Sequence, residues 1–169
     1  MSTPRRTAAA RLGAVAAGLA AILAPALTAA PAGAAVPGPD VVRNAATNKC
    51  LEVADWRTDN GAPVRQWTCH GGANQQWIRT GDHEYVNVHS GKCLDIPDYS
   101  RASGTQAVQW TCNRGLNQAW TETVVHHSGI HTLTNVHSGL VLDVPASDPA
   151  DGVPVVQWVP NQGLNQVWI

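Results

Sequence analysis

Three stretches of the sequence repeat the same set of side chains that can stack on or hydrogen-bond to a ligand. In each stretch an acidic residue lies fifteen positions before a Trp, and that Trp lies seven positions before an Asn that is followed by Gln-x-Trp. The three sets are Glu52, Trp67, Asn74 and Gln75; Asp95, Trp110, Asn117 and Gln118; and Asp143, Trp158, Asn165 and Gln166. Four residue types held in register three times indicate a triplicated unit that carries one group of binding residues per copy.

The chemistry of such a set fits a carbohydrate. A pyranose has an apolar face of C–H groups, on which an aromatic ring can stack. Its rim of hydroxyls both donates and accepts hydrogen bonds, so it can be bound by an amide and, through charge-assisted bonds, by a carboxylate. The second and third copies carry the full set. In the first copy Glu52 replaces Asp and adds a methylene, so the sequence leaves open whether this copy binds.

Each of these residues also has a structural explanation. The three Gln side chains could serve solely to satisfy backbone groups. The two Asp could bond their own backbone in turns, and the three Trp could belong to the core. Three polar residues just past the second Cys position are further candidates for the same pockets: His70, Asn113 and Asn161. The sequence contains seven His without metal-ligand spacing, so we expect structural or surface roles for them and neither a metal nor a cofactor.

The first 35 residues predict a secretory signal peptide. Three Arg fall within the first eleven residues, an apolar run follows from Leu12 to Leu23, and small residues at 32–35 suit a cleavage site. A membrane anchor is disfavoured, because the apolar run is shorter than the roughly 20 residues that a bilayer span requires. We therefore expect a secreted, extracellular protein without membrane insertion. Residues 36–40 form a short lead-in.

The charge balance of the remaining chain argues against two classes of partner. Removal of the signal peptide takes three Arg and no acid, which leaves eight basic against twelve acidic residues and a net charge of about −4. A mildly acidic domain without a basic stripe is a poor partner for nucleic acid or for an anionic membrane surface. The length suits one core but not a catalytic domain beside a binding domain, and we expect a monomer.

The four Cys fit an exported protein. Cys50 and Cys69 are 19 residues apart, as are Cys93 and Cys112, and each pair occupies equivalent positions of its own copy. The repeat therefore selects the bridges Cys50–Cys69 and Cys93–Cys112 from the three connectivities that four Cys allow. The third copy has Val141 and Pro160 at these positions, so we expect the fold to tolerate the loss of the bridge.

From Val41 onward the sequence is strand-like and rich in turns. Short runs such as LEV, LDIP, VLDV and TLTNV are bounded by Gly, Asn, Asp, Ser and Pro, and no long apolar period of 3.6 residues occurs. Gly61, Gly104 and Gly152 share one repeat position, which predicts a hairpin turn with positive φ. Three all-β units could form a closed trefoil, a small propeller or an open solenoid. The sequence lacks polar caps for a solenoid, so closure is favoured.

The three Gln-x-Trp motifs with upstream Cys-Leu-Asp resemble the ricin B-type lectin domain, which is similar to the family 13 carbohydrate-binding modules of bacterial glycanases. The resemblance covers residues 41–169. It implies an all-β fold, a β-trefoil with pseudo-threefold symmetry and three lobes of four strands, here about 41–84, 85–127 and 128–169. It also implies that Trp77, Trp120 and Trp168 pack inward, whereas the Trp of each Gln-Trp pair faces the sugar.

We accordingly expect a non-catalytic, multivalent lectin whose partner is a galactose-type sugar or a xylan- or arabinan-type polysaccharide. A glycosidase needs two carboxylates within roughly 5 to 10 Å of one bond, whereas the recurrent acids here are one per lobe. The alternative is a trefoil that binds protein, such as an inhibitor, and keeps the motifs only for folding.

Overall fold

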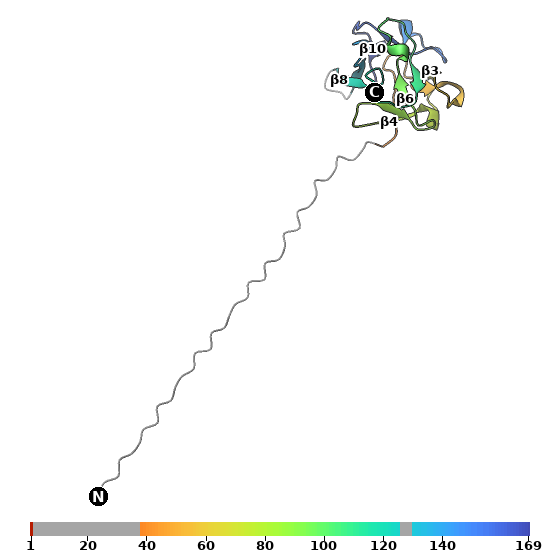
Figure 1. Ribbon diagram of the computed structural model, residues 1–169. Helices are drawn as coiled ribbons and strands as arrows, with labels where there is room; N and C mark the ends of the chain where they lie inside the picture. The colour runs from red at the N-terminus through yellow and green to blue at the C-terminus, as the bar shows by residue number, and fades with distance from the viewer. Residues whose placement is uncertain (2–37, 126–129) are drawn as a thin grey trace. The chain divides into compact units, whose positions relative to one another are not determined.

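Eleven short β-strands and five single-turn 3-10 helices make up the described part of this computed structural model (Figure 1). The described residues are Met1, 38–125 and 130–169, so the predicted signal peptide and the loop at 126–129 lie outside them. Within these residues, no helix has the length and apolar character needed to cross a membrane.

In each lobe a 3-10 helix follows the strand that carries the repeated acid, and in the first and third lobes a second 3-10 helix carries the Asn and Gln of the Asn-Gln-x-Trp sequence. The strands are β1 (Asp40–Val41), β2 (Cys50–Val53), β3 (Ala62–Trp67), β4 (Gln76–Arg79), β5 (Tyr85–Asn87), β6 (Cys93–Asp95), β7 (Val108–Trp110), β8 (Trp120–Val124), β9 (His131–Asn135), β10 (Val141–Asp143) and β11 (Val156–Trp158). The 3-10 helices are η1 (Ala54–Trp56), η2 (Ala73–Gln75), η3 (Pro97–Tyr99), η4 (Pro145–Ser147) and η5 (Leu164–Gln166). In place of a twelfth strand, Trp168 forms isolated bridges with Asn44 and His131.

The strands form two antiparallel sheets that are joined at the chain ends. One sheet has the order β1-β4-β5-β6-β7-β3-β2 and the other β11-β10-β9-β8. Adjacent lobes pair where β3 meets β7, and bridges such as Gln106 with Val156 continue this contact between the second and third lobes. Backbone hydrogen bonds of 3.0 and 2.8 Å join Arg43 and Ile169 in both directions. The predicted closure is therefore confirmed, and the fold is a β-trefoil.

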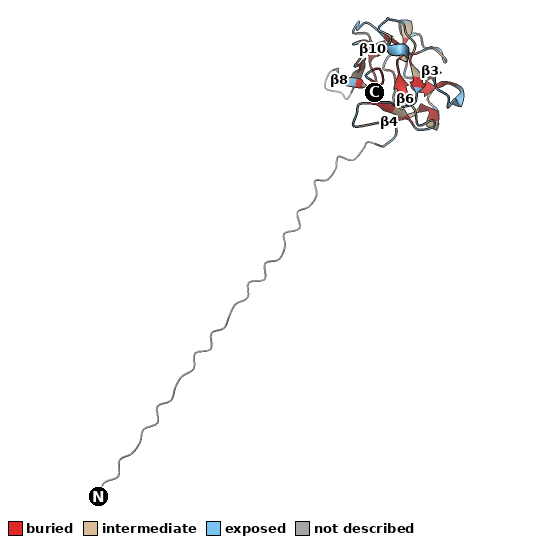
Figure 2. Cartoon of the chain, viewed as in Figure 1, coloured by how far each residue is buried: buried red, intermediate tan, exposed pale blue. Residues whose placement is uncertain are grey.

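The Trp of each Gln-x-Trp motif anchors the core. Trp77, Trp120 and Trp168 are buried together with aliphatic residues of all three lobes, as predicted. Figure 2 shows buried residues in strands such as β3 and β6. Each indole Nε1 donates to the carbonyl oxygen of the Leu that precedes the repeated acid, at 3.0, 3.1 and 3.0 Å; these carbonyls belong to Leu51, Leu94 and Leu142. The core Trp thus fixes the strand end that presents the acid.

A second set of Gln residues, the Gln of each Gln-Trp pair, ties every lobe to the one before it. The Gln157 amide donates to the carbonyl oxygens of Ser100 and Ala102 in the second lobe, both at 3.0 Å. Gln109 bonds in the same way to residues 57 and 59 of the first lobe, and Gln66 to residues 148 and 150 of the third. These three buried amides form a cyclic set of contacts between lobes.

Both predicted disulfides are present. Cys50 is bonded to Cys69 and Cys93 to Cys112, each across 19 residues. In the third lobe the strand that begins at Val141 forms without a bridge. The predicted positive φ at Gly61, Gly104 and Gly152 is also confirmed, at 80°, 85° and 85°.

Candidate functional site

The acid of the second lobe lies at the end of β6, where the chain turns into η3. Asp95 is buried, and its Oδ2 accepts hydrogen bonds from Gln118 Nε2 at 2.7 Å and from Asn117 Nδ2 at 3.1 Å. None of the residues that the structure describes donates to its Oδ1. Asp95 lines a pocket of about 190 Å³, so the carboxylate is held through one oxygen and offers the other to a ligand.

The third lobe repeats this arrangement at the end of β10. Asp143 Oδ2 accepts from Gln166 Nε2 at 2.8 Å and from Asn165 Nδ2 at 2.9 Å. Asp143 and Asn165 line a pocket of about 220 Å³. The two lobes therefore hold their acids in the same way, as expected when the same residues repeat at the same spacing.

The Gln of each Gln-x-Trp motif lies beneath its pocket. Gln118 is fully buried, accepts from the backbone N–H of Asn113 at 2.9 Å and donates to the carbonyl oxygen of Thr111 at 3.1 Å. Gln75 and Gln166 make the equivalent bonds. Neither Gln118 nor Gln166 lines the pocket around the acid of its lobe. Their position suits support of the acid and of the following loop, rather than contact with a ligand.

Two of the three Trp predicted to face a sugar are exposed at the end of their strands, whereas Trp67 of the first lobe is partly buried. Trp110 is 41% exposed and Trp158 42% exposed, in contrast to the buried Trp of the Gln-x-Trp motifs. The polar residues just past the second Cys position join them at the pockets, as the repeat suggested. The second-lobe pocket is lined by Asp95, Pro97, Asp98, Tyr99, Trp110, Asn113 and Asn117. The third-lobe pocket is lined by Asp143, Pro145, Ala146, Trp158, Asn161 and Asn165.

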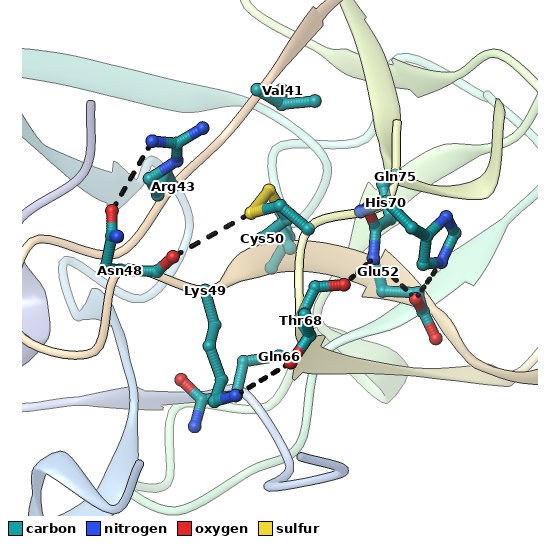
Figure 3. Close-up of a disulfide and its surroundings, with 12 residues drawn as sticks. Val41, Arg43, Asn48, Lys49, Cys50, Glu52, Gln66, Thr68, His70 and Gln75 are labelled. Atoms are coloured by element: carbon teal, nitrogen blue, oxygen red, sulfur yellow. Dashed lines mark hydrogen bonds and ion pairs between the residues drawn. A yellow bond between two sulfur atoms is a disulfide. The ribbon is translucent and has the colours of Figure 1, made fainter. Parts of the chain in front are cut away.

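In the first lobe, neighbouring side chains already hydrogen-bond to the acid, Glu52. Arg65 Nη2 donates to Glu52 Oε1 at 2.9 Å, and Gln75 Nε2 donates to Oε2 at 2.8 Å. His70 Nε2 lies 3.1 Å from the same Oε2, and Figure 3 shows His70 and Gln75 pointing at Glu52. Both carboxylate oxygens are thus occupied by the protein itself.

Arg65 also covers the Trp of the first lobe. Its guanidinium carbon lies 4.2 Å from the centre of a Trp67 ring, which places a cation where a sugar face would stack. Asn74 remains buried, bonded through Nδ2 to the carbonyl oxygen of Val53 at 3.1 Å. The four predicted residues of this lobe lie together. Side chains of the protein itself, however, already occupy the positions at Glu52 and Trp67 that a ligand would take.

The register of the strands explains this difference. Glu52 is paired with Arg65 across the β2–β3 hairpin, whereas Asp95 and Asp143 are each paired with a Val. Arg65 was not among the residues predicted from the sequence, because an Arg occurs at this position in one copy only. The sequence feature that could have pointed to it is its position, two residues before the repeated Trp.

The 3-10 helix after each acid supplies pocket residues that sequence reasoning missed. Asp98 and Tyr99 in η3 adopt the left-handed conformation, with φ of 56° and 51°, and Ala146 and Ser147 in η4 do the same. These side chains therefore project from a tight turn directly after the acid. Because none of them is Gly, no composition signal marked the turn.

Burial shifts the titration of both repeated Asp. It raises the pKa of Asp95, an effect that the hydrogen bonds from Gln118 and Asn117 oppose and the nearby charge of Asp98 reinforces. Burial likewise raises the pKa of Asp143 against the hydrogen bonds from its Gln and Asn. Desolvation is the largest cause in both lobes, and it raises the pKa because it disfavours the charged form of the carboxyl group.

One further group of potential ligand atoms occurs in the described residues. Glu84 lies close to Cys93 and Cys112, but the two sulfur atoms are joined in a disulfide and cannot act as thiolate ligands. His126 and His127 of the predicted surface His fall outside the described residues. Trp56 is 49% exposed and lies against the rings of His70 and His89.

Comparison with known proteins gives the same architecture. Residues 40–168 match the ricin-type beta-trefoil lectin domain. The designed threefold-symmetric protein ThreeFoil is 36% identical, with a TM-score of 0.71 over 76% of this chain and 94% of its own. An exo-beta-1,3-galactanase from Clostridium thermocellum is 34% identical, with a TM-score of 0.73 over 79% of this chain and 30% of its own.

A third solved structure shares the fold at lower identity. The Macrolepiota procera ricin B-like lectin, solved in complex with lactose, is 20% identical, with a TM-score of 0.68 over 81% of this chain and 96% of its own. The family match spans most of the sequence, including the three lobes, the core Trp residues and both disulfides. The chain belongs to the ricin-type β-trefoil lectin family.

Proposed function

We propose that this protein is a secreted, non-catalytic lectin that binds carbohydrate at two sites, one in the second lobe and one in the third. The observation that carries the proposal is the pairing, in each of these lobes, of an exposed Trp with a buried Asp whose Oδ1 accepts no hydrogen bond from the described residues. The Trp stacks on the apolar face of the sugar, and the carboxylate accepts from its hydroxyls.

The first lobe is not a sugar site in this proposal. Arg65, His70 and Gln75 already satisfy Glu52, and Arg65 covers Trp67. A sugar would have to displace a salt bridge from a carboxylate that is almost fully buried, and leaving such a charge unpaired is costly.

The ligand class follows from the pocket chemistry and from relatives. A galactose-type sugar is supported by the lactose complex of the Macrolepiota procera lectin and by the galactanase that carries a similar domain. A xylan- or arabinan-type polysaccharide is compatible with the same residues. Export is supported by the signal-peptide pattern and by two disulfides.

Absence of catalysis needs a test in the second lobe, because Asp98 lines its pocket beside Asp95. The third lobe has Ala146 at that position and a single acid. A glycosidase requires a carboxylate pair, so any hydrolysis should arise from the second lobe and should disappear with Asp98→Ala. We expect no release of reducing sugar from lactose, β-1,3-galactan or xylan by the unaltered protein.

Binding is tested with residues 36–169 on a glycan array, followed by calorimetry with the best small ligand. We expect two sites per chain. The variant Trp110→Ala should retain only the third-lobe site, and Trp158→Ala only the second-lobe site. An array without any sugar ligand would reject the proposal and favour the protein-binding alternative.

A further inference from the structure

The second-lobe pocket has a wall that the third-lobe pocket lacks. Tyr99 extends from η3 toward the loop that carries Asn113 and Asn117. The position that a Cβ on Gly115 would occupy is 2.7 Å from the Tyr99 hydroxyl, 2.8 Å from Asn113 Oδ1 and 2.4 Å from Asn117 Oδ1. The Tyr99 hydroxyl and the two Asn oxygens thus all lie near one point beside Gly115, and Tyr99 lines the same pocket as Asn113 and Asn117.

The ring is held in this place by the next lobe. His137 packs edge-on against the Tyr99 ring, with ring centres 5.0 Å apart. The Nε2 atom of His137 lies 2.9 Å from the carbonyl oxygen of Tyr99. Although the residue is 49% exposed, these contacts and the left-handed backbone of η3 limit its movement.

The third lobe is open at the same end. Ser147 stands at the position of Tyr99 and does not line the pocket. The three heavy atoms nearest to a Cβ on Gly163 belong to Asn165 and Asn161, and none of them is in η4. The first lobe has Ala46 at the repeat position of His137. A ring placed at Ser147 would therefore lack the neighbouring His that packs against Tyr99.

We propose, building on the proposed function, that Tyr99 makes the second-lobe site specific for the end of a glycan chain, whereas the third-lobe site binds residues inside a chain. A sugar within a chain carries linkages on two sides, and a pocket that encloses it must leave room for both. The Tyr99 ring removes room on one side. A terminal sugar has a free hydroxyl there, and the Tyr99 hydroxyl can hydrogen-bond to it.

The test uses proteins with a single remaining site: Trp158→Ala for the second lobe and Trp110→Ala for the third. The probes are lactose and β-1,3-galactan fractionated by chain length, and the measurement is the amount of protein bound per gram of polymer at saturation. The second-lobe protein should bind galactan in inverse proportion to chain length, because the number of ends per gram falls in that proportion. The third-lobe protein should show no such dependence.

Variants of Tyr99 in the second-lobe protein identify the cause. Tyr99→Ser, which copies the third lobe, should abolish the dependence on chain length, and Tyr99→Phe should preserve it because the wall remains. In the third-lobe protein, Ser147→Tyr combined with Ala46→His should introduce the dependence. A second-lobe protein that binds long and short galactan equally per gram, or that keeps its dependence after Tyr99→Ser, would overturn the proposal.

Lactose separates this inference from the underlying function. If both single-site proteins bind lactose but ignore chain length, the lectin function stands and the role of Tyr99 fails. If neither protein binds lactose or galactan, and the array is also empty, both proposals fail together. Lactose binding by the second-lobe protein without binding to any galactan fraction also contradicts the inference, since each fraction presents chain ends.

Discussion

Trp158 of the third lobe lies against Gly104 of the second, so closely that a Cβ on Gly104 would stand 3.2 Å from its Cζ3 atom. Trp110 is related to Gly61 of the first lobe in the same way, but the corresponding distance is 3.8 Å, an ordinary contact. In each proposed site, the Trp that stacks on the sugar therefore contacts a Gly of the preceding lobe. The contact is tighter in the third-lobe site, so that site should tolerate a substitution of its Gly less well.

Gly104→Ala should weaken sugar binding in the third lobe, because the added methyl group must displace the Trp158 ring. Gly61→Ala is the matched control, since both Gly have φ near 80° and each substitution should cost about 1 to 2 kcal/mol of stability through the left-handed backbone. Calorimetry on single-site proteins and thermal unfolding separate the two effects. Equal weakening of both sites would mean that backbone strain, rather than contact with the Trp, is responsible.

Truncation of the two Trp classes should have opposite consequences. Trp120→Ala removes a fully buried ring and should destabilise the domain by about 3 to 5 kcal/mol. Trp110→Ala should leave the unfolding temperature nearly unchanged and remove sugar binding from the second lobe. Circular dichroism melts and sugar titrations distinguish the two, and comparable unfolding of both variants would assign Trp110 to the core.

The first lobe can be converted into a site if its internal partners are what block it. Glu52→Asp, Arg65→Val and His70→Asn together copy the second lobe, where Asp95 pairs with Val108 and Asn113 follows the Cys. We expect this triple variant to gain a third sugar site in calorimetry. Glu52→Asp alone should gain none, because Arg65 still covers Trp67. A third site in the single variant would show that the length of the Glu, not the cation, prevents binding.

On acidification, sugar binding should decline at a pH above 3.8, the ordinary pKa of Asp. The reason is that burial raises the pKa of Asp95 and Asp143. A protonated carboxyl loses acceptor capacity for sugar hydroxyls. The effect of these two groups on stability has the opposite sign. Their pKa is higher in the folded than in the unfolded state, so their protonation favours folding. The loss of binding therefore does not reflect unfolding caused by these groups.

Calorimetry and thermal unfolding between about pH 4 and pH 7 check this pH dependence. Asp98→Asn supplies an internal control, because the charge of Asp98 helps to raise the pKa of Asp95. It should move the midpoint of the second-lobe site to lower pH and leave the third-lobe site unchanged. An identical shift in both lobes would contradict the assignment of the titrating groups.

The features that repeat in the sequence could be predicted, and those that occur once could not. The burial of Trp77, Trp120 and Trp168 was implied by the resemblance to the ricin B-type lectin domain, which rests on the three repeated Gln-x-Trp motifs. The role of Arg65 depends on its cross-strand pairing with Glu52, which becomes visible only when the register is known.

Local backbone conformation limited the prediction in two more places. Tyr99 adopts a left-handed conformation that its residue type does not signal. The turn at 44–48 matches those at 87–91 and 135–139 in its backbone hydrogen bonds but shares only Asn44 with their Asn-Val-His-Ser-Gly sequence. Its equivalence was hidden because Asn48 takes the positive φ that Gly supplies in the other two.

The cyclic set of Gln amides means that no lobe is a self-sufficient folding unit. Gln66, Gln109 and Gln157 each find their backbone acceptors in another lobe, so an excised lobe would leave both its own amide and its loop carbonyls without partners. Water would bond to these groups in an isolated peptide, and the buried contacts between lobes could be rebuilt only with two more copies of it. A single lobe, expressed alone, should therefore fold as a homotrimer whose population depends on peptide concentration, and dilution should unfold it.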